Sequence, residues 1–303
     1  MDNSVLNKKI KLIALDLDGT VLTDEKTITP RTAKAIADAA RCGIEVVPVT
    51  GRPLSGIPED LLKIPGIRYM ITSNGAITAR LSGTEKFSFS GAPAACSAVT
   101  EYSSLRSEFL DRASAESIIG LCLERALTFN IFIDGIGYAL PDSCSRLIER
   151  FTGTPLDDYV RKSRCPATDI PALMREKGSR VENIWIKTKD RAERDELDRL
   201  IHRCDVNTVL TAPTDIEVGS PLADKGLALS ALAKTLGLSR ESILAMGDND
   251  NDLGMLRAAG TAVAMGNATQ SVKAMADLTA ASNQEDGVAI ILEEITRNTS
   301  EFY

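Results

Sequence analysis

Largely apolar runs recur over the first 75 residues of the chain, separated by segments that have only one apolar face. The first run, LIAL at 12–15, is entirely apolar, and two others lie at 44–50 and 69–75. A short apolar run predicts a strand buried on both faces, as in a parallel sheet. Strands of this kind alternating with helical segments predict two strand–helix–strand units and a parallel, doubly wound sheet.

The segment after the first run predicts a helix that begins at Pro30. Thr29 precedes it as a favourable N-cap residue, and proline is favoured in a first helical turn. Gly43 lies where the helix is expected to end. Four residues at helical spacing form the expected apolar face: Ala33, Ile36, Ala37 and Ala40.

The last 90 residues repeat this alternation of strand and helix patterns, which assigns them to the same sheet. Strands are predicted at 214–218, 242–248, 261–266 and 277–281. Helices are predicted from Lys225, from about Leu253 and at 287–295.

Residues 80–210 differ from both ends of the chain, because they are richer in charge and their apolar positions alternate with polar ones. Asp134-Gly135 stands between two apolar runs and predicts a β-hairpin. An alternating strand and an amphipathic helix follow it. We therefore predict an α/β protein with a Rossmann-like core, residues 1–79 and 211–303, into which an α+β domain at 80–210 is inserted.

Composition narrows the range of functions. The length of 303 residues suggests about two domains, and no apolar run reaches the roughly 18 residues of a membrane helix. The first ten residues lack the apolar segment of a secretory signal, so a cytoplasmic protein with no membrane partner is expected, as a monomer or weak dimer. A net charge of −7 without a basic run argues against a nucleic-acid partner. The single histidine, His202, lies in a charged helical pattern and is expected to be a surface residue.

Four polar clusters follow predicted strands or begin a predicted helix: Asp16 with Asp18, Thr50 to Arg52, Lys225, and GDNDND at 247–252. Ligands of open α/β sheets bind just beyond the carboxyl ends of the strands. Each cluster alone is explained equally well by a turn, a helix cap or a solvated charge. Together, acids with one lysine and one hydroxyl indicate a site for a hard cation and a phosphate.

Mg²⁺ fits this group of residues, because it prefers one or two carboxylates, water and a phosphate oxygen. A carboxylate beside a neutralised phosphate can attack phosphorus. Asp16 stands at the end of the strand and is the expected nucleophile. Asp18, two residues later, is placed to give a proton to the leaving oxygen and then to take one from water.

The clusters resemble, in order, the four motifs of the haloacid dehalogenase superfamily of phosphohydrolases. DLDGT at 16–20 resembles the first motif, Thr50 the second, Lys225 the third and GDNDND the fourth. The segments VTGRP, SNGA, DKGLAL and EDGVA narrow the resemblance to the Cof-like branch, whose members carry a type IIB cap. It extends from Lys11 to Ile295.

The resemblance implies site roles residue by residue. Asp16 would be the nucleophile and Asp18 the acid/base. The implied Mg²⁺ ligands are Asp16, the Asp18 carbonyl and Asp248, with Asp252 in support. The implied phosphate-binding residues are Thr50, Gly51, Lys225 and Asn251. Two departures from the family pattern, PLADKG at 221–226 and Gly254, replace no motif residue.

The leading expectation is a Mg²⁺-dependent phosphatase that acts on a small phosphorylated metabolite such as a sugar phosphate. A phosphomutase or phosphotransferase would share the first half-reaction and pass the phosphoryl group to a hydroxyl. A signalling receiver module also groups acids, a threonine and a lysine around Mg²⁺, but the Asp16-x-Asp18 spacing and the inserted domain argue against it. Asn183, Trp185 and Lys187 alternate on one strand and either face the substrate crevice or pack within the cap.

Overall fold

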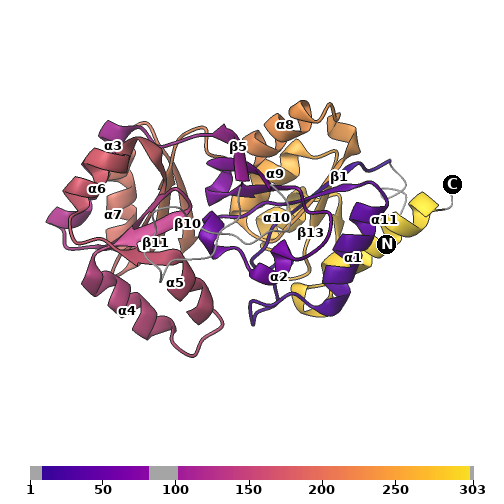
Figure 1. Cartoon of the computed structure of the whole chain (residues 1–303), viewed down its shortest axis with the longest axis horizontal. Helices are drawn as coiled ribbons and strands as arrows, with labels where there is room; N and C mark the ends of the chain where they lie inside the picture. The colour runs from indigo at the N-terminus through magenta and orange to yellow at the C-terminus, as the bar shows by residue number, and fades with distance from the viewer. Residues whose placement is uncertain (1–8, 82–101, 301–303) are drawn as a thin grey trace.

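The computed structural model describes residues 9–81 and 102–300, which form two units joined side by side (Figure 1). The first unit is built on a five-stranded parallel sheet of order β14-β13-β12-β1-β2. Its strands are β1 (Leu12–Leu15), β2 (Glu45–Pro48), β12 (Ile243–Gly247), β13 (Thr261–Ala264) and β14 (Leu278–Thr279). Strand β1 lies between β2 and β12, so the two ends of the chain share one sheet, as the sequence predicted.

Helices cover both faces of this sheet. In the view of Figure 1, α8 (Lys225–Thr235) and α9 (Leu253–Ala258) lie above the sheet, and α1 (Pro30–Arg41) and α11 (Gly287–Ser300) lie below it. The remaining helices and short 3₁₀ turns are α2 (Glu59–Leu62), α10 (Gln270–Met275), η2 (Leu54–Gly56), η3 (Ser73–Gly75), η6 (Arg240–Ser242), η7 (Asp250–Asp252) and η8 (Asn283–Glu285). The doubly wound α/β architecture is therefore confirmed.

The predicted ends of α1 are confirmed, and its predicted apolar face coincides only in part with the face that is most deeply buried. The Thr29 side chain accepts a hydrogen bond from the backbone N–H of Thr32, and Gly43 follows the helix with φ +80°. The buried residues are Thr32, Ala35, Ile36 and Ala39, whereas Ala33 and Ala37 are only partly buried. Alanines occur on several sides of this helix, so the apolar pattern alone left its rotation ambiguous.

The third apolar run does not extend the parallel sheet as an ordinary strand. β3 (Tyr69–Thr72) makes one parallel bridge, between Val49 and Ile71, and then pairs antiparallel with β4 (Ile77–Leu81). β4 in turn pairs with β5 (Tyr102–Ser107). Asn74 and Gly75 adopt positive φ values of 53° and 97°, which turn the chain directly back into a hairpin.

We call the second unit, from α3 to β11, the cap. Its six-stranded sheet has the order β10-β11-β9-β6-β7-β8 and is antiparallel except where β7 pairs with β8. The strands are β6 (Thr128–Ile133), β7 (Ile136–Ala139), β8 (Arg164–Pro166), β9 (Val181–Lys187), β10 (Asn207–Ala212) and β11 (Asp215–Gly219). The helices are α3 (Arg112–Glu124), α4 (Pro141–Phe151), α5 (Asp157–Ser163), α6 (Ile170–Lys177) and α7 (Arg191–Ile201), with a 3₁₀ turn η5 (Gly178–Arg180). The predicted hairpin is confirmed, because Asp134 and Gly135 connect β6 to β7 with positive φ.

The two faces of the cap sheet have different chemistry. One face is apolar and is buried under α3, α6 and α7; its strand residues include Phe129, Ile131, Ile184, Ile186, Ile216 and Val218. The register places Asn130, Trp185 and Glu217 directly opposite one another on the other face. That second face is polar and aromatic.

The strand predicted at 214–218 belongs to the cap and not to the parallel sheet, so that assignment was wrong. As β11 it pairs antiparallel with β9 and β10. Ile216 and Val218 are buried, whereas Asp215 and Glu217 point to the other face, and this alternation is typical of an antiparallel strand. The predicted division into 1–79 with 211–303 and 80–210 stays a prediction; the pairing shows only that β11, up to Gly219, lies in the cap sheet.

Two sequence expectations concern surface features. His202 follows α7 as its C-cap, and its side chain is half exposed beside Asp198, as expected for a surface histidine. No helix within 9–81 and 102–300 has the length and apolar character needed to cross a membrane. The segment used for the secretion prediction lies almost wholly outside the described residues.

Candidate active site

The carboxyl end of β1 carries a buried cluster of charges. Asp16 follows the strand directly, and its backbone N–H donates to the carbonyl of Met246 at 3.0 Å. The Lys225 ammonium, in the first turn of α8, donates to Asp16 Oδ1 and to Asp252 Oδ1, each at 2.6 Å. All three side chains are buried. The charges of Asp16 and Asp252 outweigh burial and raise the pKa of Lys225, so its ammonium stays protonated.

Three carboxylates meet at this point, with oxygens of Asp16, Asp248 and Asp252 within 4.8 Å of one another. Burial, and then the charge of Asp252, raises the pKa of Asp16 well above its usual value and that of Asp248 to about 6. These shifts mean that one ammonium does not fully compensate the three acids. The cluster therefore fits a divalent cation held by oxygen ligands.

The hydrogen bonds of the cluster distinguish a supporting acid from possible ligands. Asp252 uses Oδ1 for Lys225 and Oδ2 for the backbone N–H groups of Asp248 and Asn249. Asp248 Oδ1 accepts from the Thr20 hydroxyl at 3.1 Å. In the part of the chain that the structure describes, no hydrogen-bond donor contacts Asp16 Oδ2 or Asp248 Oδ2. These two oxygens are therefore available to a cation or a substrate.

Glycines allow the motifs to approach one another closely. A Cβ atom at Gly19, where φ is +85°, would lie 2.4 Å from Asp248 Oδ2, and one at Gly247 would lie 2.6 Å from Asp252. Gly254, one of the departures from the family pattern, has a related role. A side chain there would meet the carboxylate of Asp224, which caps α8 immediately before Lys225.

Asp18 lies outside this cluster and is bound by cations. The Arg52 guanidinium donates to Asp18 Oδ2 through Nε at 2.6 Å and to Oδ1 through Nη2 at 2.8 Å. Lys26 Nζ lies 3.0 Å from Asp18 Oδ1. Although burial acts in the opposite direction, the hydrogen bonds and charge of Arg52 and then Lys26 lower the pKa of Asp18 to about 2. Asp18 is therefore ionised here. Arg52 binds both of its carboxylate oxygens, a contact that the sequence pattern does not reveal.

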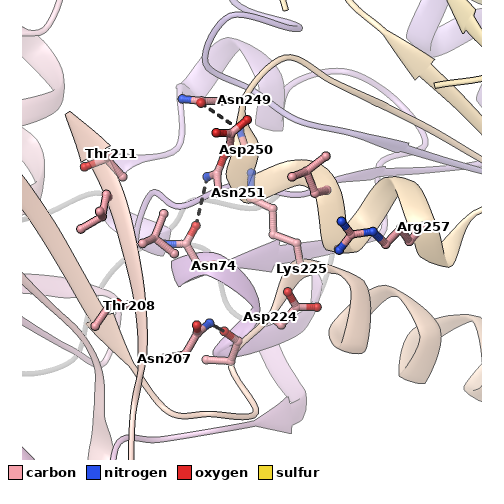
Figure 2. A pocket seen from close by; sticks show the side chains of 15 residues that line it. Asn74, Asn207, Thr208, Thr211, Asp224, Lys225, Asn249, Asp250, Asn251 and Arg257 are labelled. Atoms are coloured by element: carbon pink, nitrogen blue, oxygen red, sulfur yellow. Dashed lines mark hydrogen bonds between the residues drawn. The ribbon is translucent and has the colours of Figure 1, made fainter. Parts of the chain in front are cut away.

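Asn74 connects the predicted phosphate-binding residues, and sequence analysis assigned it no role. Its backbone N–H donates to the carbonyl of Thr50 at 3.0 Å, and a Cβ atom at Gly51 would lie 2.9 Å from its Oδ1. Asn251 Nδ2 donates to Asn74 Oδ1 at 3.4 Å, as Figure 2 shows. The Asn74 amide also donates to Glu217 of the cap. The SNGA segment, which contains Asn74, pointed to the family, but a sequence motif does not show which residues its side chains contact.

The cap is docked against this site by buried polar contacts. The Ser55 hydroxyl donates to the carbonyl of Gly135 at 2.6 Å. Glu182, fully buried in β9, accepts from the Ser73 hydroxyl at 2.6 Å and from the Gly135 N–H at 2.7 Å. The Tyr159 ring of α5 lies 4.6 Å from the Arg52 guanidinium. The contacts of Ser55, Ser73 and Arg52 join the cap to the loops that follow β2 and β3, and the Gly135 N–H fixes Glu182 from within the cap.

Glu182→Gln is expected to make the stability of the protein less dependent on pH. Burial raises the pKa of Glu182 from 4.5 to about 7, so its contribution to stability is fully present below pH 4.5 and is lost as pH rises through about 7. Glutamine resembles the protonated carboxyl and cannot ionise. The free energy of unfolding of wild type should therefore fall, relative to that of Glu182→Gln, by up to about 3 kcal/mol between about pH 5 and about pH 8.

Chemical unfolding of both proteins at the two pH values measures this difference. Glu149→Gln, at an exposed position on α4, is the matched control and should follow wild type. Parallel pH profiles for wild type and Glu182→Gln would contradict the assignment of Glu182 as a buried, titrating contact.

The structure brings the predicted site residues together in three groups. Asp16, Asp248, Asp252 and Lys225 form one cluster. Asp18 lies with Arg52, and Thr50, Gly51 and Asn251 meet around Asn74. Asp250 lies in the loop that carries Asp248 and Asp252, but it is exposed and accepts hydrogen bonds from Thr269 and Ser271. The roles of the individual residues remain proposals.

Comparison with known proteins identifies the family of the chain. The haloacid dehalogenase-like hydrolase family matches residues 13–292. The chain is 30% identical over 289 residues to a Bacillus subtilis protein named 5-amino-6-(5-phospho-D-ribitylamino)uracil phosphatase YcsE, covering 92% of this chain and 93% of that protein. A solved haloacid dehalogenase-like hydrolase from B. subtilis superposes with a TM-score of 0.77 at 27% identity, over 94% and 99% of the two chains.

A further solved structure bears on the cap. The sugar phosphatase BT4131, described as a haloacid dehalogenase of subclass IIB, has the same fold, with a TM-score of 0.73 at 21% identity over 94% of this chain and 98% of that one. With the family match over nearly the whole chain, these findings confirm the resemblance read from the motifs. The chain belongs to the haloacid dehalogenase superfamily, in its Cof-like branch, and is a phosphatase.

Proposed function

We propose that this phosphatase hydrolyses a small phosphorylated metabolite through a phosphoaspartate on Asp16, with the help of Mg²⁺. The observation that carries the proposal is the buried group of Asp16, Asp248, Asp252 and Lys225 at the end of β1. It combines a carboxylate oxygen without a hydrogen-bond donor, further acids for a cation and an ammonium for phosphate charge.

In the first step, Asp16 Oδ2 attacks phosphorus and the bond from phosphorus to the leaving oxygen breaks. The leaving oxygen takes a proton and departs as an alcohol. Asp18 is ionised in its pair with Arg52, so this proton enters with the substrate, which carries one when it binds as a phosphate monoanion. Asp18 then relays that proton to the leaving oxygen.

In the second step, water attacks the phosphorus of phosphoaspartate. Asp18 takes a proton from this water and passes it to an oxygen of the departing phosphate, so Asp18 is ionised again when the bond between phosphorus and Asp16 breaks and inorganic phosphate leaves. Lys225 stays hydrogen-bonded to Asp16 and stabilises negative charge in both steps. Thr50, Gly51 and Asn251 are the proposed contacts to the phosphate oxygens.

The proposed Mg²⁺ ligands are the carboxylates of Asp16 and Asp248 and the carbonyl of Asp18, while Asp252 orients Lys225 and the loop that carries Asp248. When bound, the cation supplies positive charge that offsets the phosphate and the clustered acids. The raised pKa values of Asp16 and Asp248 indicate that positive charge is needed there.

The reaction is tested by measuring inorganic phosphate released from a panel of phosphorylated metabolites with no acceptor added. Steady release supports hydrolysis. Phosphoryl transfer to an added alcohol without release would instead identify a phosphotransferase. A phosphoprotein that persists for minutes without turnover would identify a receiver-like module.

Activity is expected to require a divalent cation and to be highest with Mg²⁺, because all the proposed ligands are oxygens. EDTA should abolish turnover and added Mg²⁺ should restore it. Ca²⁺ should inhibit, since its larger and looser coordination would misplace Asp16 relative to phosphorus.

Mg²⁺ should also raise the Tm of the resting protein, because it relieves repulsion among the buried acids. Asp248→Asn should lose most of this shift, and Asp250→Asn, at the exposed acid in the same loop, should keep it. Full turnover in excess EDTA, or equal shifts in both variants, would contradict the metal assignment.

Three properties remain predictions from the sequence: a cytoplasmic location, a monomeric or weakly dimeric state, and the absence of a nucleic-acid or membrane partner. A sugar phosphate also remains one candidate substrate. YcsE is named for a substrate that contains a uracil ring, and BT4131 is titled a sugar phosphatase, so relatives with this fold carry names of very different leaving groups.

A further inference from the structure

A cavity of about 200 Å³ lies between the polar face of the cap sheet, helices α4 and α5, and Gly51 of the first unit. Gly51 is also a proposed phosphate contact, so the cavity begins at the phosphate site. A cavity of about 150 Å³ is enough to hold one benzene ring. The volume therefore accommodates a single substituted ring.

Aromatic side chains and one guanidinium form much of its wall. Phe132 and Trp185 contribute from the sheet, Phe151 and Tyr159 from α4 and α5. The Arg164 guanidinium lies 4.8 Å from the Phe132 ring and 4.9 Å from the Tyr159 ring, and Arg52 lies against Tyr159. These contacts hold the flat groups in place, and flat rigid walls favour a flat ligand.

Polar groups stand on the same face of the sheet. Asn130 lies directly opposite Trp185 in register and is fully buried, yet neither atom of its side-chain amide has a hydrogen-bond partner among the described residues. Glu217 also lies opposite Trp185, lines the cavity and accepts hydrogen bonds from Asn74 and Asn183. Glu217 lines the cavity, whereas Asn130 is fully buried and does not, so a ligand with a hydroxyl or amino substituent would gain by donating a hydrogen bond to Glu217.

We infer that this cavity binds the leaving group of the substrate, and that this group is a planar aromatic ring with at least one hydrogen-bonding substituent. The inference rests on the proposed hydrolysis only where it identifies the bound ring as the leaving group. Binding of a ring in the cavity is measurable without turnover. It places Trp185 in the substrate crevice, the alternative that the strand pattern left open.

A second cavity of about 350 Å³ is the competing location for the leaving group (Figure 2). It lies on the other side of Asn74 and is lined by Lys225, Asn251 and the edge strand β10, including Thr208 and Leu210. No aromatic side chain of the described residues lines it. Its lining suits a polyol better than an aromatic ring. A preference of the protein for planar over non-planar phosphate esters would therefore identify the first cavity as the binding site.

Trp185 is the only tryptophan of the chain, so its fluorescence reports directly on the first cavity. The test uses Asp16→Asn with Mg²⁺, titrated with benzyl phosphate, with cyclohexylmethyl phosphate and with 3-hydroxybenzyl phosphate. The first two differ mainly in planarity. Benzyl phosphate should bind about fivefold more tightly than cyclohexylmethyl phosphate, and the hydroxyl should tighten binding again. Glu217→Ala should remove the gain from the hydroxyl and keep the preference for planarity.

The same esters test selectivity in the active protein through kcat/KM. Trp185→Ala should lose the preference for benzyl over cyclohexylmethyl phosphate, and Trp185→Phe should retain it. Leu123→Ala, exposed on the helix that covers the opposite face of the sheet, is the control and should keep the wild-type preference.

Two results would overturn the inference: equal affinities for the planar and the non-planar ester, or a preference that responds to Thr208→Ala and not to Trp185→Ala. Its failure is distinguishable from failure of the proposed hydrolysis. Hydrolysis of all esters without preference overturns the inference alone, whereas selective binding without turnover by the wild type contradicts only the hydrolysis.

Discussion

Asp16→Asn is expected to abolish turnover of every phosphate ester, by about 10⁴-fold or more, because an amide cannot form the phosphoaspartate. The fold should survive, since Asn Oδ1 can still accept the hydrogen bond from Lys225. Removing one of three crowded carboxylates should also raise the Tm of the metal-free protein. Phosphate release and thermal unfolding measure the two effects, and residual turnover near the wild-type rate would exclude Asp16 as the nucleophile.

Asp18→Asn is the matched comparison, because it removes proton transfer and leaves the nucleophile. With an activated aryl phosphate, the first step needs no proton and should survive, while attack of water on the phosphoaspartate should slow. The variant should release about one phenolate per enzyme and then stall. Rapid-quench kinetics with mass spectrometry of the trapped protein detect the adduct on Asp16. No burst and no adduct, together with an active Asp16→Asn, would mean that the two roles are reversed.

Lys225→Ala is expected to reduce kcat/KM by about 10³-fold, far more than Arg52→Ala. Lys225 is the only cation that donates to Asp16 and Asp252 among the described residues, whereas Asp18 keeps Lys26 when Arg52 is removed. Loss of the ammonium leaves buried carboxylates unpaired, which should destabilise the protein by about 3 to 5 kcal/mol. Kinetics and chemical unfolding test both effects, with Lys34→Ala on the exposed side of α1 as the control.

A second variant keeps this prediction testable if Lys225→Ala does not fold. Lys225→Met preserves much of the side-chain volume, and adding Asp16→Asn removes one of the two acids that lose their partner. The double variant should be more stable than Lys225→Met alone and remain inactive. A folded Lys225→Met with near wild-type activity would contradict the role of the ammonium.

The sequence by itself determined the sheet and the edge at which the chemistry occurs. Apolar runs such as LIAL specify buried strands, and Thr29, Pro30 and Gly43 specify where α1 begins and ends. Because parallel strands share one carboxyl edge, residues that follow different strands must meet there. Asp16 and Asp252, which follow β1 and β12, were therefore predictable neighbours although more than 200 residues separate them, whereas Lys225 follows no strand of that sheet and was placed there by its motif.

Contacts between the two units were decided only by the tertiary structure. Local pattern shows that residues 214–218 form a strand but not which sheet it joins, because pairing with β9 depends on the complete cap. The hydrogen bonds of Asn74 with Asn251, of Arg52 with Asp18 and of Ser73 with Glu182 also depend on the folded arrangement of the chain. Polar side chains of these types are common in loops and at strand ends, and only their docked partners make them specific. The ring-sized cavity likewise arises where Trp185, Tyr159 and Gly51 converge from three separate segments, and spacing along one chain carries no record of such a convergence.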